Sequence, residues 1–363
     1  TETVTPSVGM LHTYPNDVVI HDGHGFVVNS GSDAGTLQRF EMGTWSLMET
    51  GLGTGWNCWA SLPLSSGDLA VSAALNNSIT LVDPETLTQG TTIPGVGPNP
   101  EWMAEDQGTL YVACGGWGSG NSVVVVDIAT GTVTDTLNAG TNCQSLVVGD
   151  NGNIFVLCSG TYGQDQGAVV VVDPATGSTV ATLTVGGFPG WCVAGNGRLY
   201  TADPWGAGVF SIDMENLTVL HDMNDPFCTG GNGLAMDDQG NLWVTDAMNG
   251  QVRVYDANEV LVKTFELTNP GAIAVAGAYT GIAGGVIPAT GIAVAPNPAV
   301  SVITVTGALP GSAINVFDVA GRIAARTSAG SSGEAVLSVG ELAPGLYTAV
   351  NGEMACRFAV TAR

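Results

Sequence analysis

Aromatic side chains are the residues of this sequence best suited to binding chemistry. Large aromatics supply apolar area with a polar handle and are typical of sites for small molecules, sugars or other proteins. Six of the eight tryptophans fall in or beside loops that connect strands of a sequence repeat, and we expect these loops to lie on one face of the folded chain. Packing between strands is the alternative for each, notably for two that start strands, Trp102 and Trp191. The aromatics of this face are Trp56, Trp59, Trp102, Trp117, Tyr162, Phe188, Trp191, Trp205 and Phe227.

Side-chain oxygens accompany these aromatics on the same predicted face. Such acceptors suit hydroxyls, amides or a cation, and calcium is a candidate ligand. No DxDxDG calcium loop is present, and "DDQGN" (237–241) corresponds to an ordinary turn, "GDNGN", in another repeat. The acceptors are Asp203, Asp246, Asn29, Asn57, Asn99 and Asn142.

Seven cysteines allow either disulfides or buried thiols, and their odd number leaves at least one unpaired. Cys114 and Cys158 occupy equivalent places in two repeats, and Cys143 lies just before another strand. We expect disulfides that join neighbouring repeats, Cys114 to Cys143 and Cys158 to Cys192, with buried inert thiols as the alternative. A thiolate metal site is less favoured because the sequence has no CxxC spacing.

The sequence offers no convincing catalytic constellation. A catalytic site normally gathers His, Glu or Arg side chains that transfer protons and stabilise charge. His21 and His24 in "HDGH" fall in a turn on the opposite face, where a solvated turn is the favoured interpretation. Only His12 and His221 lie near loops that could approach the aromatic face.

A repeat of about 42 residues provides the elements that must position these side chains. "SVVVVDIATGTVTDTL" (122–137) recurs almost unchanged as "AVVVVDPATGSTVATL" (168–183). Six copies of a preceding strand appear, among them "GTLYVACGG", "GNIFVLCSG" and "GNLWVTDAMNG". Each unit predicts a four-stranded antiparallel meander, and a ring of such units buries one sheet against the next. The sequence therefore predicts an all-β fold whose main part is a β-propeller.

The repeats resemble YVTN and NHL propeller repeats over roughly residues 15 to 277. We expect seven blades, with the last blade shared between the chain ends, and six blades as the alternative. "NPGAIAVAGAYTGIAGG" (269–285) would begin the shared blade, and "TETVTPSVGMLHTY" (1–14) would complete it. The predicted propeller covers residues 1–280, and a Gly- and Ala-rich linker covers 281–292.

Residues 293–363 predict a small immunoglobulin-like β-sandwich, because apolar alternation is interrupted there by Pro-Gly and Gly turns. Pro296-Asn297-Pro298, "INVFDVAGR" (314–322), "LAPGLYTAV" (342–350) and the closing "RFAV" stand in this segment. They resemble the C-terminal sorting domain of proteins exported by the type IX secretion system of Bacteroidota. The resemblance implies that this domain contacts the secretion machinery and is commonly removed. It also implies an extracellular or outer-membrane-surface location.

Charge and hydropathy limit the partners further. The net charge of −24 lies entirely before residue 288, and it makes nucleic acid an improbable partner. No run of about 18 apolar residues predicts a transmembrane segment, and the start is compatible with a removed signal peptide. We expect a secreted or cell-surface binding protein whose aromatic face captures a small molecule or a surface protein without catalysis. A structural or adhesive role and a propeller lyase or hydrolase are the alternatives.

Overall fold

The computed structural model is all-β, as predicted. The chain folds into two compact units, Thr1–Val286 and Ile287–Arg363. The predicted linker, 281–292, lies outside the described residues. The structure describes residues 9–31, 33–161, 166–203, 205, 208–275, 293–295, 299–308, 311–318, 323–340, 342–351 and 354–361.

In its described part, the first unit contains six antiparallel sheets, each of four consecutive strands. Sheets one to three consist of β1 (Pro15–His21), β2 (His24–Asn29), β3 (Ala34–Glu41), β4 (Leu47–Thr54), β5 (Cys58–Pro63), β6 (Leu69–Ala73), β7 (Ser78–Val82), β8 (Gln89–Pro94), β9 (Pro100–Asp106), β10 (Thr109–Cys114), β11 (Ser122–Asp127) and β12 (Thr132–Asn138). Sheets four to six consist of β13 (Cys143–Val148), β14 (Ile154–Cys158), β15 (Ala168–Asp173), β16 (Ser178–Thr184), β17 (Trp191–Gly195), β18 (Arg198–Asp203), β19 (Gly208–Asp213), β20 (Thr218–His221), β21 (Gly233–Met236), β22 (Leu242–Asp246), β23 (Gln251–Tyr255) and β24 (Leu261–Glu266).

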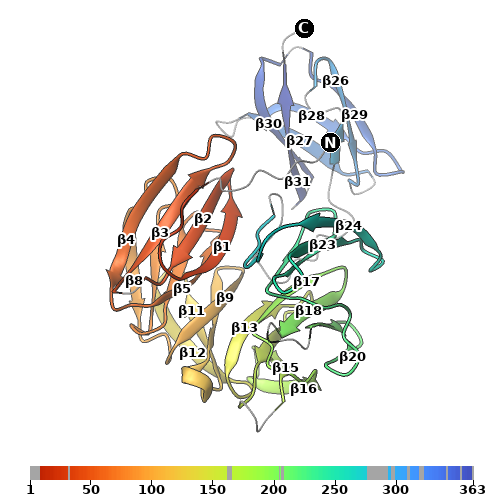
Figure 1. Cartoon of the computed structure of the whole chain (residues 1–363). Helices are drawn as coiled ribbons and strands as arrows, with labels where there is room; N and C mark the ends of the chain where they lie inside the picture. The colour runs from red at the N-terminus through yellow and green to blue at the C-terminus, as the bar shows by residue number, and fades with distance from the viewer. Residues whose placement is uncertain are drawn as a thin grey trace. The chain divides into compact units, whose positions relative to one another are not determined.

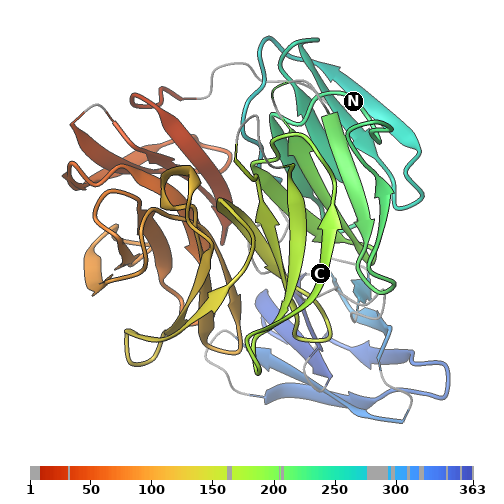
Figure 2. The same ribbon diagram turned by 90° about the horizontal axis from the view of Figure 1, so that it is seen from below.

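The sheets follow one another around a common centre, from β1 in red to β24 in teal (Figures 1 and 2). Within each sheet the strands pair in chain order, so the first strand forms one edge and the fourth the other. The first strand of each sheet lies beside the first strand of the next, from β1 through to β21. The first strands therefore line the centre, which is the arrangement of a β-propeller.

The duplicated sequence is explained by equivalent packing in sheets three and four. The third strands β11 and β15 both bury valine side chains in their middle, whereas the fourth strands β12 and β16 are largely exposed. At the end of each third strand an aspartate fixes the turn: Asp127 accepts the Thr130 N–H at 2.8 Å, and Asp173 accepts the Ala175 N–H at 2.9 Å. Asp side chains commonly stabilise turns in this way.

The two ends of the described propeller contact sheet six and sheet one. The Gly271 carbonyl accepts a hydrogen bond from Thr245 Oγ1 at 2.8 Å, and a Cβ added to Gly233 of β21 would lie 2.7 Å from the same oxygen. At the other end, Gln38 of β3 donates to the Met10 carbonyl at 3.2 Å. Residues 270–273 thus lie where the first strand of another blade would begin. Residues 1–8 and 276–292 lie outside the described part, so the number of blades stays a prediction.

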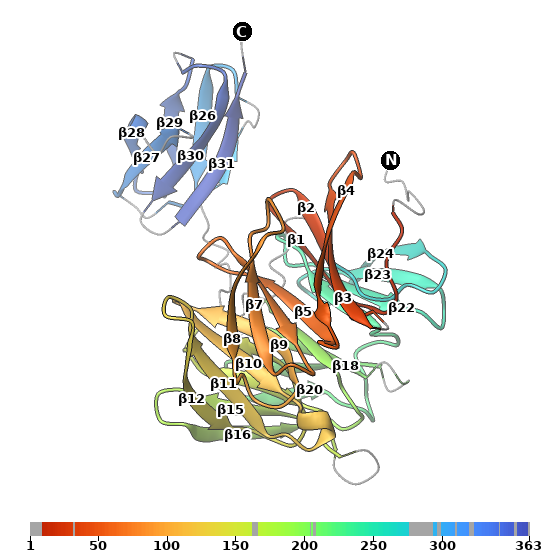
Figure 3. The same ribbon diagram turned by 90° about the vertical axis from the view of Figure 1, so that its left-hand side faces the viewer.

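The second unit is a two-layer β-sandwich, as predicted (Figure 3). Apolar side chains that include Ile303, Val305, Ile314, Val316 and Ala349 form one core between its two sheets. One sheet has the order β25-β26-β29 and the other β28-β27-β30-β31. The strands are β25 (Ala293–Ala295), β26 (Val302–Thr306), β27 (Ala313–Asp318), β28 (Ile323–Ser328), β29 (Ala335–Ser338), β30 (Gly345–Asn351) and β31 (Met354–Val360).

Candidate functional site

Three first strands of the propeller begin with the same local geometry. Asn57, Asn99 and Asn142 precede β5, β9 and β13 with φ angles of 49°, 55° and 61°. This left-handed conformation is one that Asn tolerates better than most residues. In each of these three sheets, the pairing between the first and second strands shifts register just after its first residue pair, and this bulge bends the backbone.

The next residues along these strands are equivalent in register. Trp59, Glu101 and Gln144 each follow the residue that pairs with the end of the second strand. These three side chains therefore start neighbouring first strands at the propeller centre. Sequence reasoning selected only Trp59 among them, although the alignment of the repeats marks all three positions.

Three tryptophans from different sheets make contact at this centre. Trp59 of β5 meets Trp102 of β9 edge to face, with ring centroids 6.2 Å apart, and Trp102 meets Trp191 of β17 at 6.4 Å. The second contact joins sheet three to sheet five and so bypasses sheet four. Each such pair contributes about 0.5–1.5 kcal/mol beyond area burial. We call Trp59, Trp102 and Trp191 the axial tryptophan cluster.

Glu101, which precedes Trp102 on β9, has a buried carboxyl group. Its side chain is 5 % exposed, and its Oε1 atom accepts hydrogen bonds from Asn99 Nδ2 at 2.5 Å and Gln144 Nε2 at 3.1 Å. Gln144 is itself held by Asn142 Oδ1 at 2.8 Å. Burial raises the pKa of Glu101 to about 7, although both amide hydrogen bonds act to lower it.

Several polar atoms of this region lack a hydrogen-bond partner among the described residues. They are Glu101 Oε2, Trp59 Nε1 and Trp191 Nε1, and all three atoms are buried. Unpaired buried polar atoms are uncommon and often mark a position that a ligand or water fills. The axial site therefore combines aromatic surface, one unpaired carboxyl oxygen and two unpaired N–H donors.

Four other aromatics of the predicted face have surroundings of their own. Trp117, in the short 3₁₀ helix Gly116–Gly118, and Trp205 are 60 % and 83 % exposed. Trp56 packs on the first two sheets, where its ring lies 2.4 Å from a Cβ added to Gly53. Phe227 meets the ring of Tyr255 at 4.8 Å, so it packs between sheets five and six. Tyr162 lies outside the described residues.

The predicted aspartate acceptors already accept hydrogen bonds from the protein. Asp203 accepts the N–H groups of Phe188 at 2.8 Å and Trp205 at 2.9 Å. Asp246 is 1 % exposed, accepts from Thr229 Oγ1 at 3.0 Å and pairs with Arg253. These contacts anchor loops on the predicted face. Within the described residues, no group of three or more His, Cys, Asp or Glu is placed to hold a metal ion, and calcium remains an untested expectation.

The predicted disulfides are wrong, because Cys114, Cys143, Cys158 and Cys192 are all free thiols. Cys143 instead faces its cross-strand partner within sheet four, Cys158, with 3.9 Å between the sulfur atoms. Cys192 donates to Ser145 Oγ at 3.4 Å, and Cys114 donates to the Val96 carbonyl at 3.6 Å. Burial raises the pKa of Cys114 and of Cys192 to about 12, so both stay neutral thiols. This matches the alternative of buried thiols.

The histidines lie in small surface contacts. His21 Nε2 is 3.6 Å from Asp22 Oδ2, and His12 Nε2 is 3.0 Å from Glu49 Oε2. The ring of His221 packs on Phe227, with centroids 5.8 Å apart. None of these contacts involves the axial tryptophan cluster.

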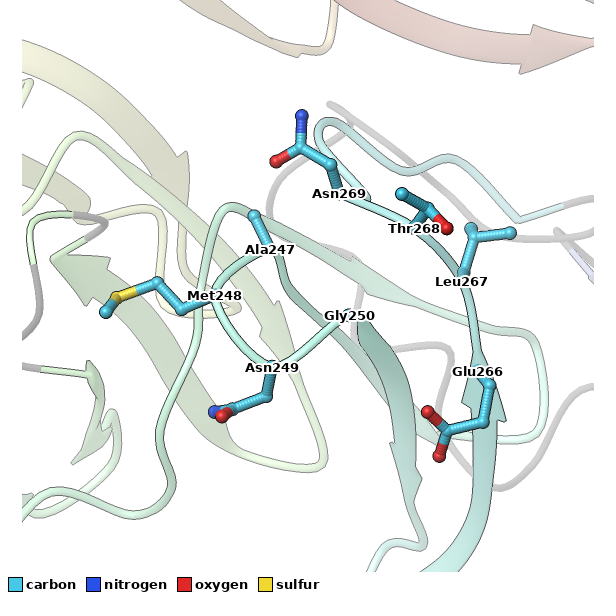
Figure 4. A pocket seen from close by; sticks show the side chains of 8 residues that line it. All are labelled: Ala247, Met248, Asn249, Gly250, Glu266, Leu267, Thr268 and Asn269. Carbon is cyan, nitrogen blue, oxygen red and sulfur yellow. The ribbon is translucent and has the colours of Figure 1, made fainter.

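An open hollow of about 510 Å³ lies away from the axial cluster, at the loop after β22 and the end of β24 (Figure 4). Its carboxylate, Glu266, accepts a hydrogen bond from Gln251 at 3.1 Å. The lining contains no aromatic ring. It is formed by Ala247, Met248, Asn249, Gly250, Glu266, Leu267, Thr268 and Asn269.

Comparison with known proteins supports the fold. Hydrazine synthase of Kuenenia stuttgartiensis is 17% identical over 76% of this chain and 93% of its own, with a TM-score of 0.58. A streptogramin B lyase is 15% identical over 74% of this chain and 89% of its own, with a TM-score of 0.59. PorZ, a surface component of the type IX secretion system of Porphyromonas gingivalis, is 14% identical over 97% of this chain and 61% of its own, with a TM-score of 0.52.

No family model and no curated protein matches the chain. At these low identities the solved structures show the fold alone, and they include both enzymes and a secretion component. The chain is therefore a β-propeller protein with a C-terminal β-sandwich. The part that the structure describes contains no helix long and apolar enough to cross a membrane.

Proposed function

We propose that this chain is an exported, non-catalytic binding protein that captures a small-molecule ligand at the axial tryptophan cluster. The observation that carries the proposal is the meeting of Trp59, Trp102 and Trp191 beside polar atoms that the described residues leave unpaired. Aromatic walls with a few convergent polar groups are typical of small-molecule sites. Each of the three tryptophans is a partly exposed residue, so a ligand can reach part of the cluster.

Binding without turnover is favoured by the shortage of catalytic partners around the site. Glu101 is a titrating group near neutrality, but its hydrogen-bond partners Asn99 and Gln144 are neutral amides. Acid and base catalysis usually needs a second charged or proton-transferring group. A lyase is the second candidate, because the pKa of Glu101 would suit a general acid and two of the similar solved structures are lyases.

Export is proposed for the C-terminal sandwich, on the resemblance of residues 293–363 to type IX sorting domains. The similarity of PorZ in fold over most of this chain is compatible with such a setting. A chain that lacks residues 293–363 should accumulate inside a type IX secreting host, whereas the full chain should reach the medium or the cell surface. Equal export of both chains would contradict this assignment.

The binding proposal is tested by native mass spectrometry of the protein purified from its own culture. We expect a non-covalent small-molecule adduct that is lost on denaturation and at least tenfold weaker in Trp102→Ala, because this ring contacts both other tryptophans. Trp243→Phe is the matched control, since Trp243 stacks on Phe265 outside the cluster. An adduct unchanged in Trp102→Ala would contradict the proposed site.

A further inference from the structure

The axial site contains a buried carboxyl group without a counter-ion among the described residues. There, Glu101 Oε2 has no hydrogen-bond partner, and Oε1 is bound only by the amides of Asn99 and Gln144. The loop after β10 passes close to this carboxyl group, because a Cβ added to Gly115 would lie 2.6 Å from Glu101 Oε1. A buried carboxylate is costly unless a positive charge or further donors meet it.

The protein's own cations are placed elsewhere. Only four Lys and Arg residues precede residue 288. Three of them pair away from Glu101: Arg39 with Glu85, Arg198 with Glu259, and Arg253 with Asp246. The fourth, Lys263, lies 5.1 Å above the ring of Phe265. The ion pairs and the ring contact of these four residues therefore do not involve Glu101.

We propose, resting on the function proposed above, that the axial site binds the ammonium group of a small amine that also carries hydroxyl oxygens, as amino sugars and amino alcohols do. Glu101 is the counter-ion of the ammonium group. Tryptophan faces attract such cations more strongly than other aromatic rings do. The two unpaired indole N–H groups, of Trp59 and Trp191, donate to the ligand's oxygens.

The charge of the propeller supports a cationic ligand. The net charge of −24 lies on this unit, and a field of one sign concentrates ligands of the opposite sign at the surface. An anionic ligand would meet both this field and the Glu101 carboxylate. A ligand that binds through a carbonyl oxygen would accept a hydrogen bond from the neutral form of Glu101, which gives the opposite dependence on pH.

The direction in which amine binding changes with pH follows from the titration of Glu101. Because burial raises the pKa of Glu101 to about 7, the carboxylate form that attracts an ammonium group increases as pH rises through neutrality. The neighbouring titratable group is the Cys114 thiol, whose pKa of about 12 keeps it neutral. Alkylamines remain protonated over this range. Amine binding therefore strengthens with rising pH.

The test is isothermal titration of the full chain with 6-amino-6-deoxyglucose and ethanolamine, each against its hydroxyl counterpart, glucose or ethylene glycol. We expect at least one amine to bind tighter than its counterpart, by about tenfold or more at about pH 8, and tighter at about pH 8 than at about pH 5.5. Glu101→Gln should abolish both preferences, and Glu101→Asp should retain part of them.

Two results would overturn the inference. One is that neither amine binds better than its hydroxyl counterpart, and the other is that a correctly folded Glu101→Gln keeps the preference. Trp102→Ala separates this inference from the function proposed above. If glucose or the culture adduct binds the wild type and Glu101→Gln equally but binds Trp102→Ala weakly, the proposed ligand capture stands and the amine is excluded. If no ligand binds the wild-type protein, the proposed function and the amine inference both fail.

Discussion

At the scale of single residues, Glu101 is the group on which binding and stability both depend. Its carboxyl group is 5 % exposed, and only one of its oxygens is bonded within the described residues. Polar groups in such positions cost stability in the free protein and are retained where they serve a ligand. At a pH where Glu101 is ionised, the ligand-free wild-type protein should therefore be less stable than a variant with a neutral side chain at position 101.

Glu101→Gln tests this cost through the dependence of stability on pH. The folded-state pKa of about 7 exceeds the usual value of 4.5, so unfolding releases a proton between these values and the folded state loses stability as pH rises. The free energy of unfolding of the wild-type propeller should fall by about 3 kcal/mol, relative to Glu101→Gln, between about pH 4 and about pH 8. Urea unfolding at several pH values measures it, and parallel pH profiles for the two proteins would contradict it.

Residue-scale reasoning from sequence had uneven success for physical reasons. Trp59, Trp102 and Trp191 could be selected because tryptophan is large and its place in the repeat is clear. Glu101 was missed although Asn99–Glu101 aligns with Asn57–Trp59, because the sequence does not show that its carboxyl group is buried. The disulfide prediction failed because Cys143 faces Cys158 within its own sheet, a pairing that depends on register and not on the order of the repeats.

At the scale of elements, the repeat was predictable because its signals are local. Buried apolar runs mark the second and third strands, and turns after Asp127 and Asp173 follow from hydrogen bonds to residues two or three positions ahead. The closing sector depends on contacts between distant parts of the chain. Asn269, with φ of 49°, and Pro270 repeat the entry that Asn99 and Pro100 make into β9.

Truncation tests whether this second entry begins a closing strand. A chain ending at residue 268 should lose about 2 kcal/mol or more of propeller stability, because it uncovers β21 and leaves Thr245 without its bond to Gly271. A chain ending at residue 292 is the matched control, since it lacks the sandwich but keeps this segment. Equal unfolding transitions in the two truncated chains would contradict the closing role.

At the scale of the whole molecule, charge and packing both separate the two units. The propeller carries the entire net charge, and the sandwich has a core of its own. The architecture was predictable because composition, repeats and charge all change near the same part of the chain. The ligand was not, because the identity of a bound molecule depends on a few side chains that only the folded ring brings together.

The central claim is that a ligand binds at the axis and not on the exposed loops. The most direct measurement is the indole N–H spectrum of ¹⁵N-tryptophan-labelled protein, recorded with and without the small-molecule fraction of the producing culture. We predict that the Trp59 and Trp191 signals move while that of Trp243, which already donates to Asp237 at 2.9 Å, stays fixed. Movement confined to the exposed Trp117 and Trp205, or no movement at all, would contradict the account.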